Sequence, residues 1–213
     1  LRMLTEILVQ NLSEYPTESD VKNARTLITY CKNMLLSEEE IRELGKEEGI
    51  PLWEIYSAYN RYLKQNSFMD YDDQMLYAYR MLKGSPELLK FYQEKYRYIC
   101  VDEAQDTSRI QHAIVSLLAG AGGNLFLVGD EDQSIYGFRA AYPEALLRFS
   151  SVWPGAKTLL LEDNYRSTPE ILAACNSLIS KNANRIKKDL LPMLPGGAPV
   201  LCHHAANSEQ EAR

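Results

Sequence analysis

The stretch YICVDEAQDTS, residues 98–108, decides how the fold of this chain is interpreted. Four residues typical of a buried strand end abruptly in two adjacent carboxylates, Asp102 and Glu103, and an amide and a third carboxylate follow closely. Unpaired charges are costly away from water, so a buried strand gains nothing from such a tip. The pattern therefore predicts that a cation, or a reaction, is found at the end of this strand.

Two further apolar runs also end in polar residues. NLFLVG (124–129) and KTLLLE (157–162) are each long enough for a buried strand, and the helical patterns TSRIQHAIVSLLAG (107–120) and YPEALLRFSSVW (142–153) lie between the runs. Strands that alternate with helices favour an α/β fold with a parallel sheet. All strands of such a sheet end on one side, where ligands bind. We therefore expect the polar clusters 102–106, 129–133 and 162–166 to converge on one site.

The N-terminal part of the chain has helical patterns throughout. The expected helices are TESDVKNARTLITYCKNML (17–35), SEEEIREL (37–44), PLWEIYSAYNRYLKQN (51–66), DYDDQMLYAYRMLKG (70–84) and SPELLKFYQEKY (85–96), and a further one, STPEILAACNSLISKN (167–182), lies near the C-terminus. Ser37 with Glu40 three residues later is a capping-box pattern. The sequence thus predicts an all-helical subdomain ahead of the parallel sheet.

Composition limits the possible classes of protein. The chain has 213 residues, 46% of them hydrophobic and 24% charged, which suits a folded soluble protein. It contains neither an apolar run of about 20 residues nor a signal peptide, so we expect no membrane partner and a cytoplasmic location. The net charge of −6 does not indicate a nucleic-acid binder, so any such function must rest on local features.

The cysteine and histidine pattern indicates no metal centre. Four scattered cysteines without a CxxC pair are typical of reduced thiols. CHH at 202–204 resembles a set of metal ligands, but adjacent strand residues point to opposite faces, and no second cluster completes a site. Two ordinary histidines at a strand end are the favoured interpretation.

The three polar clusters have the residue types of a phosphoryl-transfer site. An Asp at the tip of an apolar strand, such as Asp102, suits a Mg²⁺ ligand, and the adjacent Glu103 suits the residue that orients or deprotonates water. Gln133 has the reach to sense a terminal phosphate, and Arg166 can stabilise charge on the transferred group. A surface turn would explain one such pair, but it explains three clusters in register poorly.

These segments also resemble a known family. VDEAQDTS (101–108), LVGDEDQSIYGFRAA (127–141) and LEDNYRSTPEIL (161–172) are similar to motifs II, III and IV of the UvrD/Rep-like superfamily 1 DNA helicases, and FMDYDDQML (68–76) is similar to the segment that precedes motif II. The resemblance implies a partial P-loop NTPase (RecA-like) sheet, with ATP and Mg²⁺ as cofactors. It implies these roles: Asp102 holds Mg²⁺, Glu103 acts on water, Gln133 contacts the γ-phosphate, Tyr165 stacks on adenine and Arg166 reaches the γ-phosphate.

The same resemblance implies a contact with single-stranded DNA through Tyr136, Phe138 and Arg139. Aromatic faces accept any base, and stacking contributes ~1–3 kcal/mol per base without sequence preference. The family often has Trp where Phe138 stands, so we expect somewhat weaker stacking here. The basic run KNANRIKK (181–188) either adds phosphate contacts or is a solvated helix face.

One expected element is missing from the sequence. ELGKEEG (43–49) and AGAGGN (119–124) both fail as a glycine-rich phosphate loop that ends in Lys-Ser/Thr. We therefore expect a fragment of an ATP-dependent DNA helicase, with a helical accessory subdomain (1–66), part of the first motor domain (67–160) and the start of the second (161–213). Two alternatives stay open: a helicase subunit of a helicase–nuclease complex, and a non-catalytic DNA-binding relative.

Overall fold

The computed structural model describes residues 2–202 and 204–211, which form two compact units. The first unit ends at Arg148 and the second begins at Phe149. Among the described residues, no helix is both long enough and apolar enough to cross a membrane.

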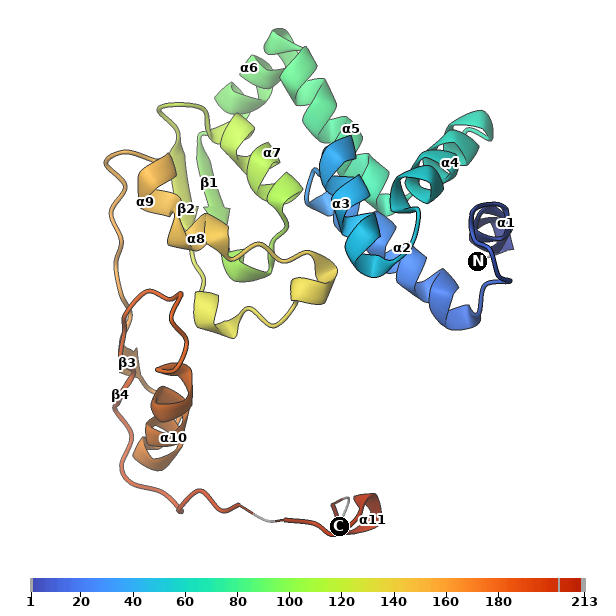
Figure 1. Cartoon of the computed structure of the whole chain (residues 1–213). Helices are drawn as coiled ribbons and strands as arrows, with labels where there is room; N and C mark the ends of the chain where they lie inside the picture. The colour runs from blue at the N-terminus through green and yellow to red at the C-terminus, as the bar shows by residue number, and fades with distance from the viewer. Residues whose placement is uncertain (1, 203, 212–213) are drawn as a thin grey trace. The chain divides into compact units, whose positions relative to one another are not determined.

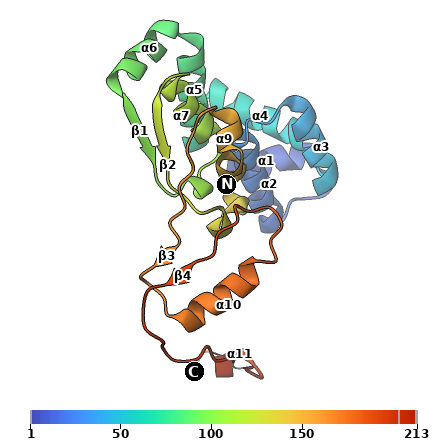
Figure 2. The same cartoon turned by 90° about the vertical axis from the view of Figure 1, so that its left-hand side faces the viewer.

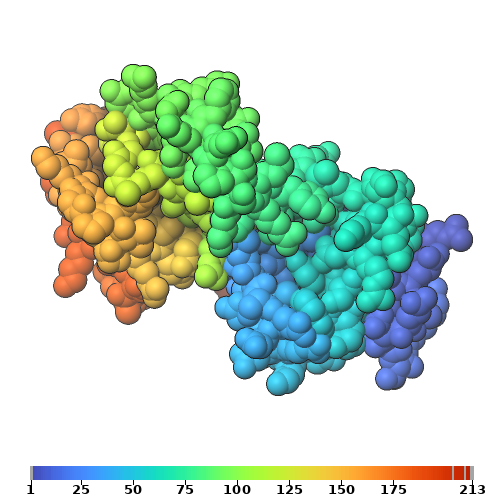
Figure 3. Space-filling view, turned by 90° about the horizontal axis from the view of Figure 1, so that it is seen from above, coloured from blue at the N-terminus to red at the C-terminus, as the bar shows by residue number. Residues whose placement is uncertain are grey.

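Helices make up most of the first unit (Figure 1), and Figure 3 shows the same chain in space-filling form. They are α1 (Arg2–Asn11), α2 (Glu18–Asn33), α3 (Glu38–Glu48), α4 (Leu52–Gln65), α5 (Tyr71–Gly84) and α6 (Pro86–Lys95). Capping boxes at Thr17, Ser37 and Asp70 start α2, α3 and α5, so the sequence prediction at Ser37 is confirmed. A buried cluster centred on Leu8, Ile28 and Ile55 holds α1, α2 and α4 together.

A two-stranded parallel sheet follows the helices, as Figure 2 shows. β1 (Tyr98–Val101) pairs with β2 (Asn124–Leu127) in a register that runs from Tyr98 opposite Asn124 to Val101 opposite Leu127. The crossover between them contains α7 (Arg109–Ala119), which packs beside β1. The predicted parallel pairing of these two runs is confirmed, and both strands end at the same edge.

The segment after β2 departs from the prediction of one helix over 142–153. Two 3₁₀ turns, η2 (Glu131–Gln133) and η3 (Gly137–Arg139), come first, and α8 (Glu144–Leu147) completes the first unit. The helix then breaks at Arg148, where φ is −100° and ψ is 8°, and α9 (Phe149–Val152) begins the second unit. The single-helix prediction is therefore wrong.

The second unit contains α9, β3 (Asp163–Asn164), α10 (Pro169–Ile179), β4 (Leu191–Pro192) and α11 (Ser208–Glu211). The strand predicted at 157–162 is absent: Leu159 and Leu161 are 80% and 88% exposed, and the parallel pairing falls instead between β3 and β4. A strand needs a neighbour for its backbone hydrogen bonds. Within the part of this unit that the structure describes, β4 offers that neighbour only from Glu162 onward, where Leu191 N donates to Glu162 O.

Candidate functional site

The chain turns sharply where β1 ends. Asp102 and Glu103 are both exposed there, and the Asp102 Oδ1 atom accepts a hydrogen bond of 2.9 Å from the backbone N–H of Glu103. Glu103 has φ 48° and ψ 43°, in the left-handed region that residues other than glycine rarely occupy. Backbone strain of this kind costs on the order of 1 kcal/mol and is characteristic of functional sites. The turn therefore places two exposed carboxylates in consecutive positions at the end of β1.

Gln105 connects this turn to the next strand. Its side chain is buried, with the residue only 2% exposed, and its Nε2 donates to Glu103 Oε2 over 2.7 Å. Its Oε1 accepts from the backbone N–H of Asp130 at 3.0 Å, and Asp130 Oδ2 in turn accepts from Gln133 Nε2 at 2.7 Å. An unbroken chain of hydrogen bonds thus joins Glu103 to Gln133.

The sequence prediction brought Asp102, Glu103 and Gln133 to one edge of the sheet, but it did not identify Gln105 or Asp130 as the residues that join them. The signal for Gln105 was its position inside the DEAQD run, because an amide between carboxylates can donate to one group and accept from another. Burial, which decides the matter, is not visible in the sequence.

Gly129 allows the two strand ends to approach closely. A Cβ atom at this position would lie 2.7 Å from Gln105 Oε1 and 2.9 Å from Leu146 Cδ1, both inside normal contact distance. The backbone N–H of Ala104 also donates to Val128 O at 2.9 Å. The absent side chain therefore leaves room for the Gln105 amide between the two predicted clusters.

The aromatic segment Tyr136–Arg139 follows three residues after Gln133. The rings of Tyr136 and Phe138 lie 5.9 Å apart between centroids, and the Arg139 guanidinium lies over both, at 5.4 Å and 5.5 Å. Phe138 is 65% exposed and Tyr136 is 37% exposed. Two solvent-facing rings beside a cation form a surface suited to base stacking and phosphate contact.

The third predicted cluster belongs to the second unit. Asn164 Oδ1 accepts from the backbone N–H groups of Arg166 and Ser167, at 3.0 Å and 2.8 Å, and this turn leads into α10. Tyr165 is 69% exposed, and Arg166 is also exposed. The expectation that Arg166 reaches the site of Asp102 stays a prediction.

Other segments were also singled out in the sequence: the two glycine-containing segments, the basic run 181–188 and the segment 202–204. Gly45 and Lys46 lie inside α3, and Gly120, Gly122 and Gly123 follow α7. Residues 181–188 form no helix, so a solvated helix face does not explain that basic run. In the 202–204 segment, His203 lies outside the described residues.

The oxygen donors present fit Mg²⁺, which prefers carboxylates and water. Asp102 offers an exposed carboxylate at the strand tip. Asp130, Glu131 and Asp132 also bring carboxylate oxygens within 4.8 Å of one another, although exposed acidic groups often lie together without a metal.

Comparison with known proteins adds the family. The model of the UvrD/REP helicase N-terminal domain matches residues 1–154. The chain is 39% identical over 186 residues to the ATP-dependent DNA helicase PcrA of Staphylococcus epidermidis, covering 87% of this chain and 26% of that protein. It is 37% identical over 214 residues to DNA helicase II of Escherichia coli, covering 100% of this chain and 29% of that protein. The chain thus spans little more than a quarter of the length of these relatives.

Proposed function

The chain belongs to the UvrD/REP helicase N-terminal domain family, and from this premise we propose that it is part of an ATP-dependent DNA helicase. The helicase would couple Mg-ATP hydrolysis to movement along single-stranded DNA and to unwinding of the duplex, with 3'→5' polarity by resemblance. DNA repair, replication or recombination in the cytoplasm is the corresponding process. The observation that carries the proposal is the hydrogen-bonded chain from Glu103 to Gln133, which ends three residues before the aromatic segment.

In this proposal Glu103 acts on the attacking water. The hydrogen bond from buried Gln105 to Glu103 Oε2 fixes the carboxylate, while the strained backbone holds it at the strand tip. A general base needs this fixed geometry before its pKa matters. Asp102 would hold Mg²⁺, whose charge would offset the negative charge that develops on the phosphates.

Gln133 would report the state of the nucleotide to the DNA. Its side-chain amide donates to Asp130 Oδ2, and a terminal phosphate is a competing acceptor for the same N–H group. A change of partner at Gln133 would shift a residue only three positions before Tyr136. Nucleotide and DNA contacts would therefore be coupled through a short stretch of backbone. Tyr165 and Arg166 of the second unit would complete the nucleotide contacts, on adenine and the γ-phosphate.

The DNA part of the proposal is tested on the chain itself. Phe138→Ala should weaken binding of a fluorescein-labelled oligo-dT by about tenfold in anisotropy titrations, as expected for the loss of one stacked base. Phe91→Ala is the matched control, because Phe91 is similarly exposed, at 57% against 65%, and lies on α6. Equal affinities for the two variants would contradict the assigned DNA contact.

The catalytic part is tested in a full-length helicase that contains this sequence. Glu103→Gln should abolish DNA-stimulated ATP hydrolysis and leave nucleotide binding intact, because the amide keeps the size of the side chain but cannot accept a proton. Glu94→Gln, an exposed change on α6, should leave turnover unchanged. Retained turnover in Glu103→Gln would refute the role of this carboxylate.

Two alternatives remain within the proposal. The lack of a phosphate loop in this sequence favours weak ATP binding by the chain alone, which a non-catalytic DNA-binding relative would also show. Micromolar Mg-ATP affinity in a calorimetric titration of the chain would contradict the expected weak ATP binding and would argue against a non-catalytic relative. A helicase subunit of a helicase–nuclease complex would share every residue discussed here.

The division of the chain into domains also belongs to the proposal. Residues 1–66 would be a helical subdomain, residues 67–160 part of the first motor domain, and residues 161–213 the start of the second.

A further inference from the structure

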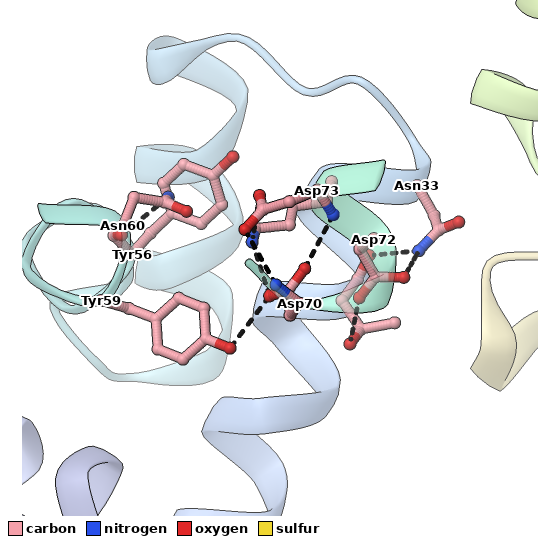
Figure 4. Close-up of polar contacts among 9 residues, drawn as sticks. Asn33, Tyr56, Tyr59, Asn60, Asp70, Asp72 and Asp73 are labelled. Atoms are coloured by element: carbon pink, nitrogen blue, oxygen red, sulfur yellow. Dashed lines mark hydrogen bonds and ion pairs between the residues drawn. The ribbon is translucent and has the colours of Figure 1, made fainter. Parts of the chain in front are cut away.

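Lys32, in the last turn of α2, carries a buried charge. Its side chain has no exposed surface, and its Nζ lies 2.7 Å from Asp70 Oδ2 and 2.7 Å from Asp73 Oδ1. The two aspartates begin α5, where they also form the capping box of that helix. Figure 4 shows them facing the end of α2 beside Asp72 and Asn33. The cluster thus joins two helices whose paired residues are 38 and 41 positions apart in the chain.

Neighbouring side chains supply further hydrogen bonds to the aspartates of the cluster. Tyr59 donates its hydroxyl to Asp70 Oδ2 at 2.9 Å, and its ring lies 5.0 Å from Lys32 Nζ. Asp72 accepts from Thr29 Oγ1 at 2.9 Å and from Asn33 Nδ2 at 2.8 Å. Burial acts to raise the pKa of Asp70, but the hydrogen bonds from Lys32 and the backbone of Asp73 outweigh it and lower the pKa below its usual value.

A buried ion pair is a weak source of stability, because desolvation of the charges offsets their attraction. Apolar residues of the same volume would often serve the fold equally well. What an ion cluster of fixed geometry does supply is one defined position for the groups that it joins. The cluster therefore fixes the position of the end of α2, and through it the position of the groups that α2 contacts.

Helix α2 contacts the aromatic segment, and its C-cap contacts α7. α2 packs against η3, and Met34 O at the C-cap of α2 accepts from Arg109 Nη1 at the start of α7, at 3.3 Å. The chain leaves α2 through Leu35 with φ 52°, so the surroundings hold this exit in a strained conformation.

The backbone just before α7 holds the residues that follow the aromatic segment. Ala141 pairs with Ser108 in an isolated bridge, and Tyr142 N donates to Thr107 O at 2.9 Å. The aromatic segment and the residues that follow it therefore have two supports, α2 and the backbone just before α7. The support from α2 depends on where that helix ends in space.

We propose that Lys32, with Asp70 and Asp73, is a positioning cluster that holds α2 against the segment Tyr136–Arg139 and so sets the affinity of that segment for single-stranded DNA. This role rests on the DNA contact proposed above. The cluster touches neither nucleotide nor DNA in this scheme, and it acts through the packing of α2 on η3.

The test compares Lys32→Met with Ile55→Ala in the chain itself. Ile55 has no exposed surface and lies in the core formed by α1, α2 and α4, so both changes destabilise the helices, but only the first frees the end of α2. At a temperature where both variants keep their full helical circular dichroism, Lys32→Met should bind oligo-dT about tenfold more weakly. Ile55→Ala should stay within about twofold of the unchanged chain.

A second readout reports on the segment without DNA. The amides of Arg139 and Ala140 donate to Tyr136 O and Gly137 O within η3. Hydrogen exchange at these two amides should be at least about tenfold faster in Lys32→Met and nearly unchanged in Ile55→Ala, since exchange measures local opening. Equal DNA affinities and equal exchange rates for the two variants would overturn the proposal.

The outcomes separate this inference from the DNA contact on which it rests. If Phe138→Ala binds oligo-dT as the unchanged chain does, the DNA contact itself is wrong. If Phe138→Ala weakens binding and Lys32→Met does not, only the positioning role is wrong. Should Lys32→Met fail to fold, Asp70→Asn replaces it, because Asn is an equally good N-cap, while its amide removes the charge and the oxygen that accepts from Lys32 and Tyr59. Wild-type affinity for Asp70→Asn would then reject the positioning role, and a loss of about threefold or more would support it.

Discussion

Gly129→Ala is the sharpest perturbation of the site that the structure offers. The new Cβ would lie 2.7 Å from Gln105 Oε1 and 3.2 Å from the backbone N of Ala104. The amide of Gln105 must move, and it then gives up its hydrogen bonds to Glu103 and to Asp130 N. Because Gly129 does not have a positive φ, the backbone itself accepts alanine.

The magnitude follows from opposing effects. Loss of the hydrogen bond to the Glu103 carboxylate costs about 1.5 kcal/mol, the low end for a charged acceptor, since Glu103 is exposed, and loss of the bond from Asp130 N costs about 1 kcal/mol. Alanine also reduces the conformational entropy of the unfolded chain, which stabilises the folded state by about 0.4–1 kcal/mol. We therefore expect the free energy of unfolding to fall by about 1.5–2 kcal/mol.

Urea titration followed by tryptophan fluorescence measures this change. A Trp153→Phe background leaves Trp53 as the single tryptophan, so the signal comes from the first unit. The matched control is Gly84→Ala, at the end of α5, where a Cβ meets nothing within 4 Å. There the same chemical change should stabilise the helix by up to about 1 kcal/mol.

Opposite signs at the two glycines are the expected result. In a Gln105→Ala background the clash with the amide is gone, so the cost of Gly129→Ala should fall by at least about 1 kcal/mol. If Gly129→Ala stabilises the chain as Gly84→Ala does, Gln105 does not occupy the space between the strand ends, and the proposed link from Glu103 to Gln133 fails.

Three further outcomes are expected. Burial raises the pKa of the Cys31 thiol to about 12. Ellman's reagent at pH 8 should therefore modify Cys100, Cys175 and Cys202 within the folded chain, and Cys31 only at the rate of unfolding. Burial lowers the pKa of His112, so the unfolded chain binds that proton more readily; stability should fall as pH drops from about 7 to 5, and His112→Gln should remove this dependence in urea titrations. Arg139→Ala should weaken oligo-dT binding and reduce the slope of log affinity against log salt concentration by about one phosphate contact. An unchanged slope would show that Arg139 does not contact the DNA phosphates.

Local signals in the sequence predicted the elements that local chemistry determines. The capping box at Ser37 and the helical periodicity of residues 51–66 needed no distant partner, and both are confirmed. The pairing of β1 with β2 also followed from two apolar runs on either side of a helical pattern. These features depend on residues a few positions apart, or on one right-handed crossover.

Elements that depend on a distant partner were missed. The run 157–162 has the composition of a strand, but pairing decides whether it becomes one, and the described part of its unit supplies a partner only for residues 162–164. Lys32 carries no sign in the sequence that its charge is buried, since its partners lie about 40 residues away. At the site, residue types identified Glu103 and Gln133, whereas the burial of Gln105 between them arises only from the folded sheet.

The left-handed backbone of Glu103 has a consequence for attempts to engineer this chain. Glycine at that position would relieve conformational strain of about 1 kcal/mol, and asparagine would relieve part of it. That gain is smaller than the cost of about 1.5 kcal/mol for loss of the hydrogen bond from Gln105, so a screen that selects only for resistance to heat would keep a side chain that accepts this bond. If Glu103 acts on water as proposed, the hydrogen bond from Gln105 offsets the backbone strain and explains why a carboxylate can persist at this position without loss of stability.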